Sequence, residues 1–231
     1  MKYNIHMNAI LKIDLDKILN QTEPVILELG SGEKKWPGRI CIDRLDMTHV
    51  DIVADLEEGF PFLPDNSVDA IHSKSFLEHI DHFDFLMQEI WRVLKPTGRK
   101  YLYVPHFSNP YYYSDYTHKR FFGLYTFEYF SPCQTRFKRK VPSFYQSHGF
   151  MTEEITLVFT SPWKSRKLFK RLFQKIINLH PWLMEFYEEN LCYWIPCYAL
   201  QVTLRPVKET SSQYNHSKKG HENRVCDHKA Q

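Results

Sequence analysis

The sequence predicts an α/β fold in which a doubly wound, mostly parallel seven-stranded sheet carries helices on both faces. The first observation is an apolar run of buried-strand length at 25–29 that ends abruptly in Gly30 and Gly32. The second is the recurrence of short strand-like runs along the chain, at 39–42, 50–54, 68–72 and 101–104. Short apolar runs joined by turns or helices are typical of parallel strands with crossover connections.

The segments around these runs predict the other elements of the sheet. Residues 7–20 mix helical and alternating apolar periods and indicate a short leading helix. Residues 83–94 place their apolar side chains on one side of a helix, which Pro96 and Gly98 end. Alternation at 154–160 predicts a sixth strand. The last strand is expected at 197–204.

Three segments lie outside the regular pattern. The aromatic segment 111–130 follows the fifth strand and is expected to cover the sheet. A segment of helical character, 163–194, is inserted before the last strand. We expect one domain over 1–205, and a disordered polar tail over 206–231 because almost no apolar residue occurs there.

Composition and charge limit the class of protein. The 231 residues are 43% hydrophobic and 25% charged, which is ordinary for a globular chain, whereas 16% aromatic is high. A net charge of +3 is too small to argue for a nucleic-acid partner. There is no charged-then-apolar leader and no long apolar run, and the cysteines are odd in number and scattered. We therefore expect a cytoplasmic protein.

The glycine turn predicts a nucleoside site. Glu28 precedes Gly30 by two residues, and the second strand ends in Asp43, where a carboxylate suits the ribose hydroxyls. A dinucleotide fingerprint needs a third glycine and an acid roughly 20 residues on, and Asp43 follows Gly32 at about half that distance. With little room for a phosphate-cradling helix, a nucleoside ligand without phosphate is favoured, and S-adenosylmethionine is such a ligand.

At this point the sequence resembles the class I S-adenosylmethionine-dependent methyltransferases. Residues 28–32, Glu-Leu-Gly-Ser-Gly, match their first motif, Glu/Asp-x-Gly-x-Gly. The string 61–105, with Leu-Glu-His at 77–79 and Glu-Ile-Trp-Arg-Val-Leu-Lys-Pro at 89–96, resembles the branch typical of small-molecule, lipid and cell-surface-sugar modifiers. The resemblance covers about 25–130. It implies S-adenosylmethionine as cofactor and a donor site made of Glu28, Gly30, Gly32, Asp43, Asp55, Leu56 and Ser73.

Methyl transfer is an in-line displacement, so alignment is the main requirement. A hydroxyl acceptor also has to lose a proton, and histidine is the usual base. His106 and His118 are the predicted bases, while His79 could instead brace the donor loop. Each of the three could also be an ordinary histidine at the edge of the core. No metal is predicted, because His106, Asp115 and His118 match no strong ligand spacing.

The acceptor is predicted only by class. Tyrosine-rich surfaces such as 111–130 suit sugars, aromatic compounds or lipid head groups, although the segment could simply close the core. By resemblance, we expect transfer to an oxygen of a small-molecule, glycan or lipid-linked acceptor. The alternatives are an RNA methyltransferase, since aromatics among cations also stack bases, and a non-catalytic S-adenosylmethionine-binding protein. The family often has Asp-Pro-Thr-His where this chain has Asp-Tyr-Thr-His at 115–118.

A basic amphipathic helix is predicted at 163–180. Its apolar residues recur at steps of three and four, its other side is rich in Lys and Arg, and it contains no acid. Such a helix can lie in an anionic membrane interface, which would make the protein membrane-peripheral. It could also pack on the sheet, with Glu185, Glu188 and Glu189 of the next segment facing its cations.

Overall fold

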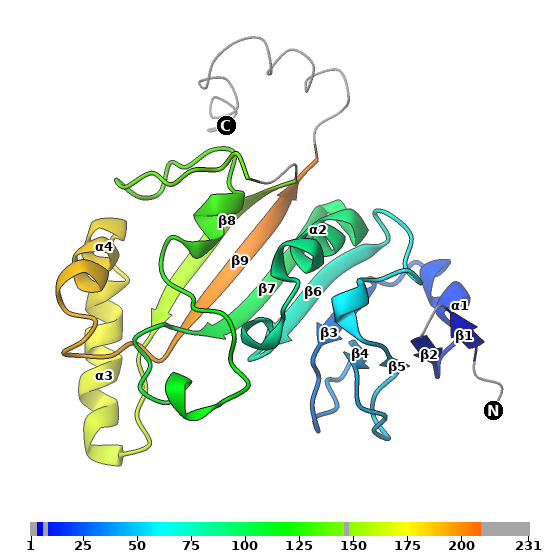
Figure 1. Ribbon diagram of the computed structural model, residues 1–231, viewed down its shortest axis with the longest axis horizontal. Coiled ribbons are helices and arrows are strands. Elements are labelled where there is room, and N and C mark those ends of the chain that lie inside the picture. Colours follow the sequence, from blue (N-terminus) through cyan, green and yellow to red (C-terminus); the bar gives the residue numbers. More distant parts are fainter. Residues whose placement is uncertain (1–3, 7–8, 146–147, 209–231) are drawn as a thin grey trace, which may run out of the picture.

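The computed structural model describes residues 4–6, 9–145 and 148–208. Its strands form one nine-stranded sheet in the order β1-β2-β5-β4-β3-β6-β7-β9-β8 (Figure 1). The strands are β1 Asn4–His6, β2 Ala9–Leu11, β3 Ile26–Leu29, β4 Ile40–Asp43, β5 Ile52–Val53, β6 Val68–Lys74, β7 Leu94–Pro105, β8 Gly149–Val158 and β9 Ala199–Val207. The helices are α1 Leu15–Leu19, α2 Phe83–Val93, α3 Lys164–Ile177 and α4 Pro181–Asn190, and the 3₁₀ helices are η1 Leu56–Glu58, η2 Leu77–His79, η3 Tyr112–Ser114 and η4 Thr126–Phe130.

The centre of the sheet is parallel, as predicted. Strands β5, β4, β3, β6 and β7 pair in parallel, with Leu27 of β3 opposite Ile40 on one side and Ile71 on the other. The chain moves from β3 outward to β4 and β5, and then returns to the other side of β3 as β6. This reversal is a topological switch point, where ligands of open α/β sheets bind beyond the carboxyl ends of the strands. The Rossmann-like α/β class is confirmed.

The predicted count of seven strands is wrong, because the amino-terminal segment pairs with the sheet. β2 lies antiparallel to β5, with Ile10 opposite Val53, and β1 pairs with β2. The leading helix predicted over 7–20 is reduced to α1, where Asp14 caps the helix by accepting a hydrogen bond from the Lys17 N–H at 3.0 Å. Residues 7 and 8 lie outside the described residues. Burial against β5 outweighs weak helix propensity in so short a segment.

The prediction of helices on both faces of the sheet is not confirmed. Among the parallel crossovers only the one from β6 to β7 contains an α-helix, α2. The connection from β3 to β4 contains Pro37 and Gly38, which disfavour a helix. On the face opposite Leu102, the ring of His72 stacks on Tyr101 at 4.6 Å, and Tyr101 is 39% exposed. At this part of the sheet, therefore, helix cover is confined to one face.

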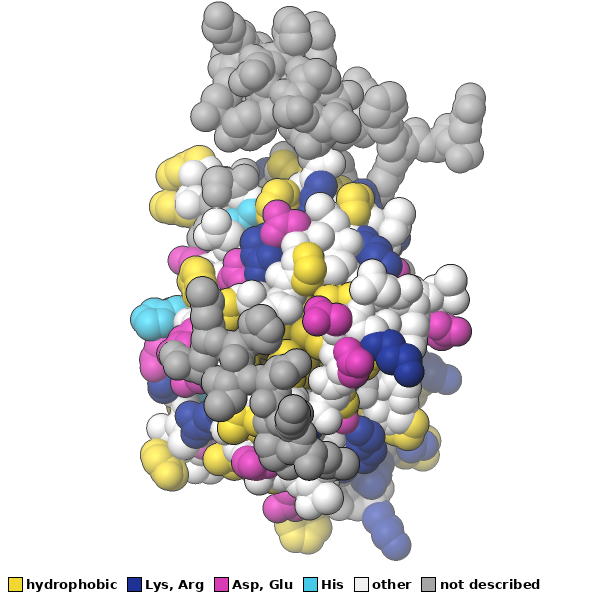
Figure 2. Space-filling model, turned by 90° about the vertical axis from the view of Figure 1, so that its right-hand side faces the viewer, with side chains coloured by type: hydrophobic (Ala, Val, Ile, Leu, Met, Phe, Trp, Pro, Cys, Tyr) yellow, Lys and Arg dark blue, Asp and Glu magenta, His cyan; other side chains and the backbone are white. Residues whose placement is uncertain are grey.

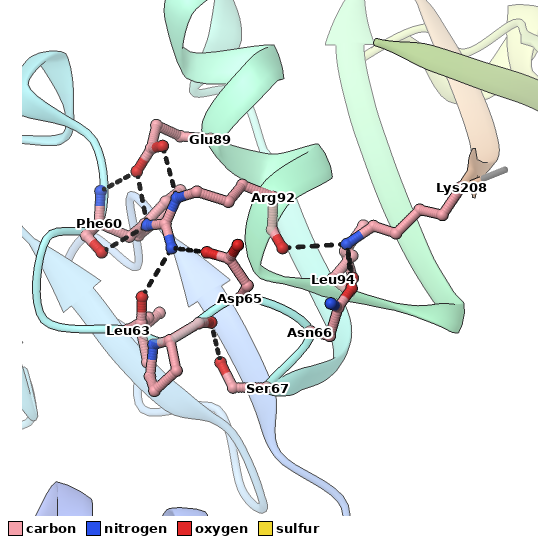
Figure 3. Close-up of polar contacts among 10 residues, drawn as sticks. Phe60, Leu63, Asp65, Asn66, Ser67, Glu89, Arg92, Leu94 and Lys208 are labelled. Carbon is pink, nitrogen blue, oxygen red and sulfur yellow. Dashed lines mark hydrogen bonds and ion pairs between the residues drawn. The ribbon is translucent and has the colours of Figure 1, made fainter. Parts of the chain in front are cut away.

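Arg92 joins helix α2 to the loop 60–65, which precedes β6 (Figure 3). Leu86, Met87 and Ile90 bury its apolar side. The Arg92 guanidinium donates to the carbonyl oxygens of Phe60 and Leu63 at 2.9 Å and forms ion pairs with Glu89 and Asp65. Glu89 in turn accepts from the Phe60 N–H at 3.0 Å. These contacts satisfy polar groups that would otherwise be buried without partners.

The carboxyl-terminal part extends the sheet by antiparallel pairing. The predicted sixth and last strands are β8 and β9, and β9 lies between β7 and β8. β8 therefore runs in the same direction as β7. β9 continues to Val207, so the predicted tail does not begin at 206. Most of that tail, 209–231, lies outside the described residues.

The predicted insertion at 163–194 forms the helix pair α3 and α4. The pair lies at the end of the sheet where β8 ends and β9 begins (Figure 1). Because β8 and β7 run in the same direction, this is also the edge at which the parallel strands end. In the described chain no helix is long and apolar enough to cross a membrane.

Candidate active site at the carboxyl edge of the sheet

The glycine turn after β3 has a backbone that only glycine adopts readily. Gly30 and Gly32 have φ angles of 62° and 58°, in the left-handed region. The Gly30 N–H donates to the Ile42 carbonyl oxygen at 2.9 Å, which ties the turn to β4. A Cβ at Gly30 would lie 2.5 Å from the ring of Phe76, whereas a Cβ at Gly32 would meet no atom within 4 Å. The second glycine therefore faces open space.

Asp43 holds this turn from the tip of β4. Its Oδ2 accepts from the Gly32 N–H, and its Oδ1 accepts from the Leu45 N–H, both at 3.0 Å. His49, which the sequence reasoning missed, lies with its Nε2 at 2.5 Å from the Gly32 carbonyl oxygen. The predicted ribose contact of Asp43 stays a prediction, and the structure shows that the same carboxylate also shapes the loop.

Two predicted donor residues have their side chains occupied elsewhere. Glu28 is 1% exposed and pairs with Arg39 at 2.5 Å. The Ser73 hydroxyl is buried and accepts from Nζ of the fully buried Lys100 at 2.6 Å. Burial lowers the pKa of Lys100 to about 7. The predicted donor contact of Ser73 stays a prediction.

Asp55 and Leu56 follow β5 at the same edge. Asp55 is the N-cap of η1, and its Oδ1 accepts from the Glu57 N–H at 3.0 Å. An Asp at this position satisfies an N–H group that would otherwise have no partner at the start of the helix. Leu56 is buried in the core. Their predicted membership of the donor site stays a prediction.

The turn also meets a structural test for a donor nucleoside. Ser31 Oγ, between the two glycines, is buried and has no hydrogen-bond partner among the described residues. A polar atom without a partner beside the open space at Gly32 is what a polar ligand would satisfy. The residues at hand therefore fit S-adenosylmethionine, with Gly30, Ser31, Gly32 and Asp43 closest to it.

His106 is not placed to act as a base, contrary to the prediction. Its side chain is fully buried. Nδ1 accepts from the Ser108 N–H at 3.1 Å and lies 2.8 Å from the Ser108 hydroxyl, while Nε2 lies 3.1 Å from Glu188 of α4. With both ring nitrogens engaged and no exposed surface, His106 joins the end of β7 to the helix pair. Its partner lies far away in the sequence, so no local pattern indicated this role.

His118 lies in a different cluster, with Glu78 and His79. One ligand atom of each residue lies within 4.8 Å of those of the other two. His118 Nδ1 lies 2.8 Å from the Tyr112 carbonyl oxygen, and its Nε2 lies 3.5 Å from Asp115. Burial raises the pKa of Glu78 to about 7, with the nearby Asp115 adding to the effect, and burial lowers the pKa of His79. The Leu-Glu-His motif was the sequence signal for Glu78, whose role the prediction left open.

Backbone contacts hold the two halves of this cluster together. The N–H groups of Lys119 and Arg120 donate to the Glu78 carbonyl oxygen at 2.7 and 3.2 Å. Arg120 Nε donates to the Ile80 carbonyl oxygen at 3.1 Å. The loop after β7 is thereby fixed beside η2, which follows β6. Because β6 is the strand next to β3, the cluster lies at the donor edge.

The aromatic segment 111–130 divides into two sets of side chains. Phe122 and Phe127 are buried and stack at 5.8 Å, and Phe122 and Phe130 contact Phe83 of α2. A second set is exposed near the cluster, namely Tyr111, Tyr113, Tyr116 and Phe121. The segment therefore closes the core and also offers aromatic surface.

A cavity of about 310 Å³ lies at the same edge but away from the glycine turn. It opens between the loop after β7 and the start of α3. Its wall combines aromatic side chains with two cations, and includes Tyr111, Trp163, Arg166, Phe169, Lys170 and Trp194. Such a wall suits an acceptor with both apolar and anionic parts.

One family model and several solved structures are similar to the chain. A family model described as a methyltransferase domain matches residues 38–102. The chain is similar to an S-adenosylmethionine-dependent methyltransferase from Archaeoglobus fulgidus, with 15% identity, 83% of this chain and 90% of that chain covered, and a TM-score of 0.46. It is also similar to phosphoethanolamine N-methyltransferase 2 from Haemonchus contortus in complex with S-adenosyl-L-methionine, with 16% identity, 84% and 51% covered, and a TM-score of 0.45. No curated protein matches the chain.

The matched segment contains the end of β4, the turn at Asp55 and the Glu78–His79 pair, and so spans much of the edge described above. With the glycine turn just before it, this match identifies an S-adenosylmethionine-dependent methyltransferase. S-adenosylmethionine is its cofactor and supplies a methyl group on a positively charged sulfur.

Proposed function

We propose that this methyltransferase modifies an oxygen of a lipid-linked acceptor, such as a sugar carried on an anionic lipid, at a membrane surface. The observation that supports the proposal is the unpartnered apolar side of the helix pair α3 and α4. Leu168, Leu172 and Leu179 are 77%, 59% and 76% exposed. Apolar residues at helical spacing that stay in solvent to this extent mark an interaction surface.

The apolar surface continues beyond α3. Trp182 and Phe186 of α4 stack on each other at 5.6 Å and are exposed, as are Trp163 and Trp194 at the ends of the insertion. The packed side of α3 is a different set of residues, in which Phe173 contacts Phe159 and Tyr187. Exposed tryptophans beside aliphatic side chains are typical of the membrane interface.

Cations border this surface without acidic partners. Lys164, Lys167 and Arg171 are exposed and form no ion pair with any residue of the described chain. Glu185 and Glu188, which the packing alternative placed opposite these cations, have other partners. Glu185 accepts from the Tyr125 hydroxyl, and Glu188 accepts from the Leu124 N–H. The basic side of α3 is therefore free to meet anionic lipid.

The opposite side of the molecule has another character. Figure 2 shows the side of the molecule around α1 and the first strands, where acidic and basic side chains are interspersed. The helix pair α3 and α4 would therefore be the side of the molecule that contacts a membrane. That orientation brings the carboxyl edge, with its cavity and its glycine turn, towards the lipid, and Arg166 and Lys170 could meet an anionic head group in the cavity wall.

Different residues at the carboxyl edge of the sheet would orient the donor, hold the acceptor and remove its proton. The glycine turn and Asp43 orient the donor, and the exposed aromatics of 111–130 hold the acceptor against it. A hydroxyl acceptor must lose its proton. The cluster of Glu78, His79 and His118 lies at the donor edge of the sheet and offers nitrogen lone pairs that could accept it. His118 therefore stays the predicted base, while His106 is withdrawn from that role.

Co-sedimentation with anionic vesicles at moderate salt tests the proposal. The wild-type protein should bind, and Lys167→Glu with Arg171→Glu should weaken binding at least tenfold, since each cation near an anionic surface contributes about 1 kcal/mol. Lys17→Glu with Lys34→Glu is the matched control, because both lysines are exposed and lie outside the insertion. No wild-type binding, equal loss in both variants, or a preference for single-stranded RNA would overturn the proposal.

A further inference from the structure

We propose that Glu78, His79 and His118 form a binding site for one divalent transition-metal ion. A carboxylate and two imidazoles place ligand atoms within 4.8 Å of one another, a separation that a single ion can bridge. The three residues come from two segments that fold together, η2 after β6 and the loop after β7. Two histidines with one carboxylate is a common donor set for zinc and for non-haem iron.

The first supporting observation is the way each imidazole is oriented. His118 Nδ1 lies 2.8 Å from the Tyr112 carbonyl oxygen, which can only accept, so the proton is on Nδ1 and Nε2 carries a lone pair. His79 Nδ1 lies 2.9 Å from the Thr117 hydroxyl oxygen, and that hydroxyl donates to Asp115 at 2.6 Å. The Thr117 oxygen must then accept from His79. Metal-binding histidines show this pattern, with one nitrogen donating to an oxygen and the other free.

The second supporting observation is the carboxylate of Glu78. The residue is 1% exposed, and its Oε2 has no hydrogen-bond partner among the described residues. A buried carboxylate oxygen is costly unless it is paired or coordinates a metal. No cation from Lys or Arg pairs with Glu78 in the described chain. Because a ligand atom of each histidine lies within 4.8 Å of one from Glu78, a divalent ion bound here would also satisfy this buried carboxylate.

The donor types indicate which ions would bind. Imidazole nitrogen favours Zn²⁺, Fe²⁺ and Co²⁺ over the oxygen-seeking Mg²⁺ and Ca²⁺. Three protein ligands leave at least one position open, as in catalytic metal sites. Asp115 lies on the exposed side, 3.5 Å from His118 Nε2, and is the residue that would compete for that nitrogen if the imidazole were protonated.

The use of the ion rests on the proposed function, whereas its binding does not. An acceptor hydroxyl at the open position would lose its proton near neutral pH, because a bound cation stabilises the alkoxide, and the proton would pass to solvent. The oxygen would then attack the methyl carbon while the carbon–sulfur bond breaks and sulfur keeps the electron pair. In that case His118 is a ligand and not a free base.

Titration of the full-length, chelator-treated protein with Co²⁺ tests the site without any acceptor. We expect one ion per chain and the visible absorption of nitrogen-coordinated Co²⁺. Glu78→Gln, His79→Asn and His118→Asn should each weaken binding at least tenfold. Thr117→Val, which removes the partner of His79, should weaken it about tenfold, the low end for such supporting contacts.

Controls separate this site from other causes of metal binding. The chain also carries His216, His221 and His228, so a variant with all three changed to Gln should still bind one ion. Calorimetry with S-adenosylmethionine should give unchanged affinity in His118→Asn, which shows that the variant is folded and keeps its donor site. No wild-type binding, loss of binding in the His216, His221 and His228 variant, or unchanged binding in His118→Asn would overturn the metal site and leave methyl transfer untouched.

Discussion

Asp43 illustrates how one residue serves loop geometry and ligand binding together. Its two carboxylate oxygens each accept one backbone N–H, from the glycine turn and from the residue two positions on. A carboxylate has further lone pairs, so these bonds leave it able to accept from ribose hydroxyls as well. The residue therefore couples the shape of the glycine turn to the occupied donor site.

Replacing Asp43 should weaken donor binding. Asp43→Ala removes the predicted ribose contacts and the bond to Gly32, and should cost about 1.5–3 kcal/mol of S-adenosylmethionine binding, the scale of hydrogen bonds to a charged group. Isothermal calorimetry measures the loss. Asp46→Ala is the control, because Asp46 is exposed and pairs only with Lys12 at the surface. Equal affinities in Asp43→Ala and wild type would place Asp43 outside the ribose site.

Lys100 should make stability depend on pH. Its pKa is lowered to about 7 in the folded protein, whereas the unfolded chain has the ordinary value of 10.5. Between these values the unfolded state binds more protons, so the free energy of unfolding should rise with pH, and the penalty is fully present below pH 7. Lys100→Met should remove this rise and be more stable at pH 7, on the order of 1 kcal/mol or more, since one pKa unit is worth about 1.4 kcal/mol.

Urea unfolding at pH 7, 8 and 9 measures the difference between wild type and Lys100→Met. The difference should shrink as pH increases, because the wild-type penalty fades towards pH 10.5. Parallel stability curves for the two proteins would contradict the neutral buried amine. The lost bond to Ser73 acts against the gain equally at each pH and so does not mimic the slope.

At the scale of elements, Arg92 fixes the loop 60–65 to α2. Its guanidinium contacts two carbonyl oxygens and one carboxylate of this loop, and the carboxylate of Glu89 on α2 itself. Lys208, just beyond β9, donates to the Arg92 carbonyl oxygen at 3.0 Å (Figure 3). The same turn of helix is thus bound to the loop before β6 and to the end of the last strand.

Removing this arginine should destabilise the whole fold. Arg92→Met leaves Glu89 and the Phe60 and Leu63 carbonyl oxygens without their partner, and should lower the free energy of unfolding by about 2–4 kcal/mol. Arg44→Met, at an exposed position, is the control and should change it by less than about 0.5 kcal/mol. Guanidinium unfolding followed by circular dichroism compares them, and similar losses in both would show that the contacts add little.

The parts that could be predicted from sequence are those decided locally. The central strands and α2 follow from buried apolar runs and helical spacing, and the glycine turn follows from its residues. The pairing of β2 with β5 and the role of His106 depend on partners far away in the chain, as does the meeting of Glu78 with His118. No local pattern encodes such contacts, so the prediction placed a helix at 7–20 and a base at 106.

At the scale of the whole molecule, Glu188 connects the helix pair to the sheet. It lies 3.1 Å from His106 Nε2, at the end of β7, and accepts from the Leu124 N–H at 2.7 Å in the aromatic segment. Two regions that flank the proposed acceptor site are therefore joined through one carboxylate. The position of the insertion relative to the site depends on this contact.

Glu188→Leu should reduce stability without reducing donor affinity. It leaves two buried N–H donors unpaired, at about 1–3 kcal/mol each, and does not touch the glycine turn. Thermal unfolding and calorimetry with S-adenosylmethionine measure the two quantities. Glu189→Leu, at an exposed neighbouring position, is the control. If Glu188→Leu changed donor affinity as much as stability, the separation between insertion and donor site argued above would be wrong.

The position of β9 between β7 and β8 has a consequence for synthesis on the ribosome. Residues 149–158, which become β8, and the helix pair are translated before 199–207, yet β9 is the one strand of the described residues with which β8 pairs. Until the last strand emerges, β7 has an unpaired edge and the nascent β8 has no neighbour, and unpaired edges invite association with other chains. Among the described strands, the one that completes the sheet is the last to be translated, so a ribosome that stops before residue 199 releases a chain with two open strands.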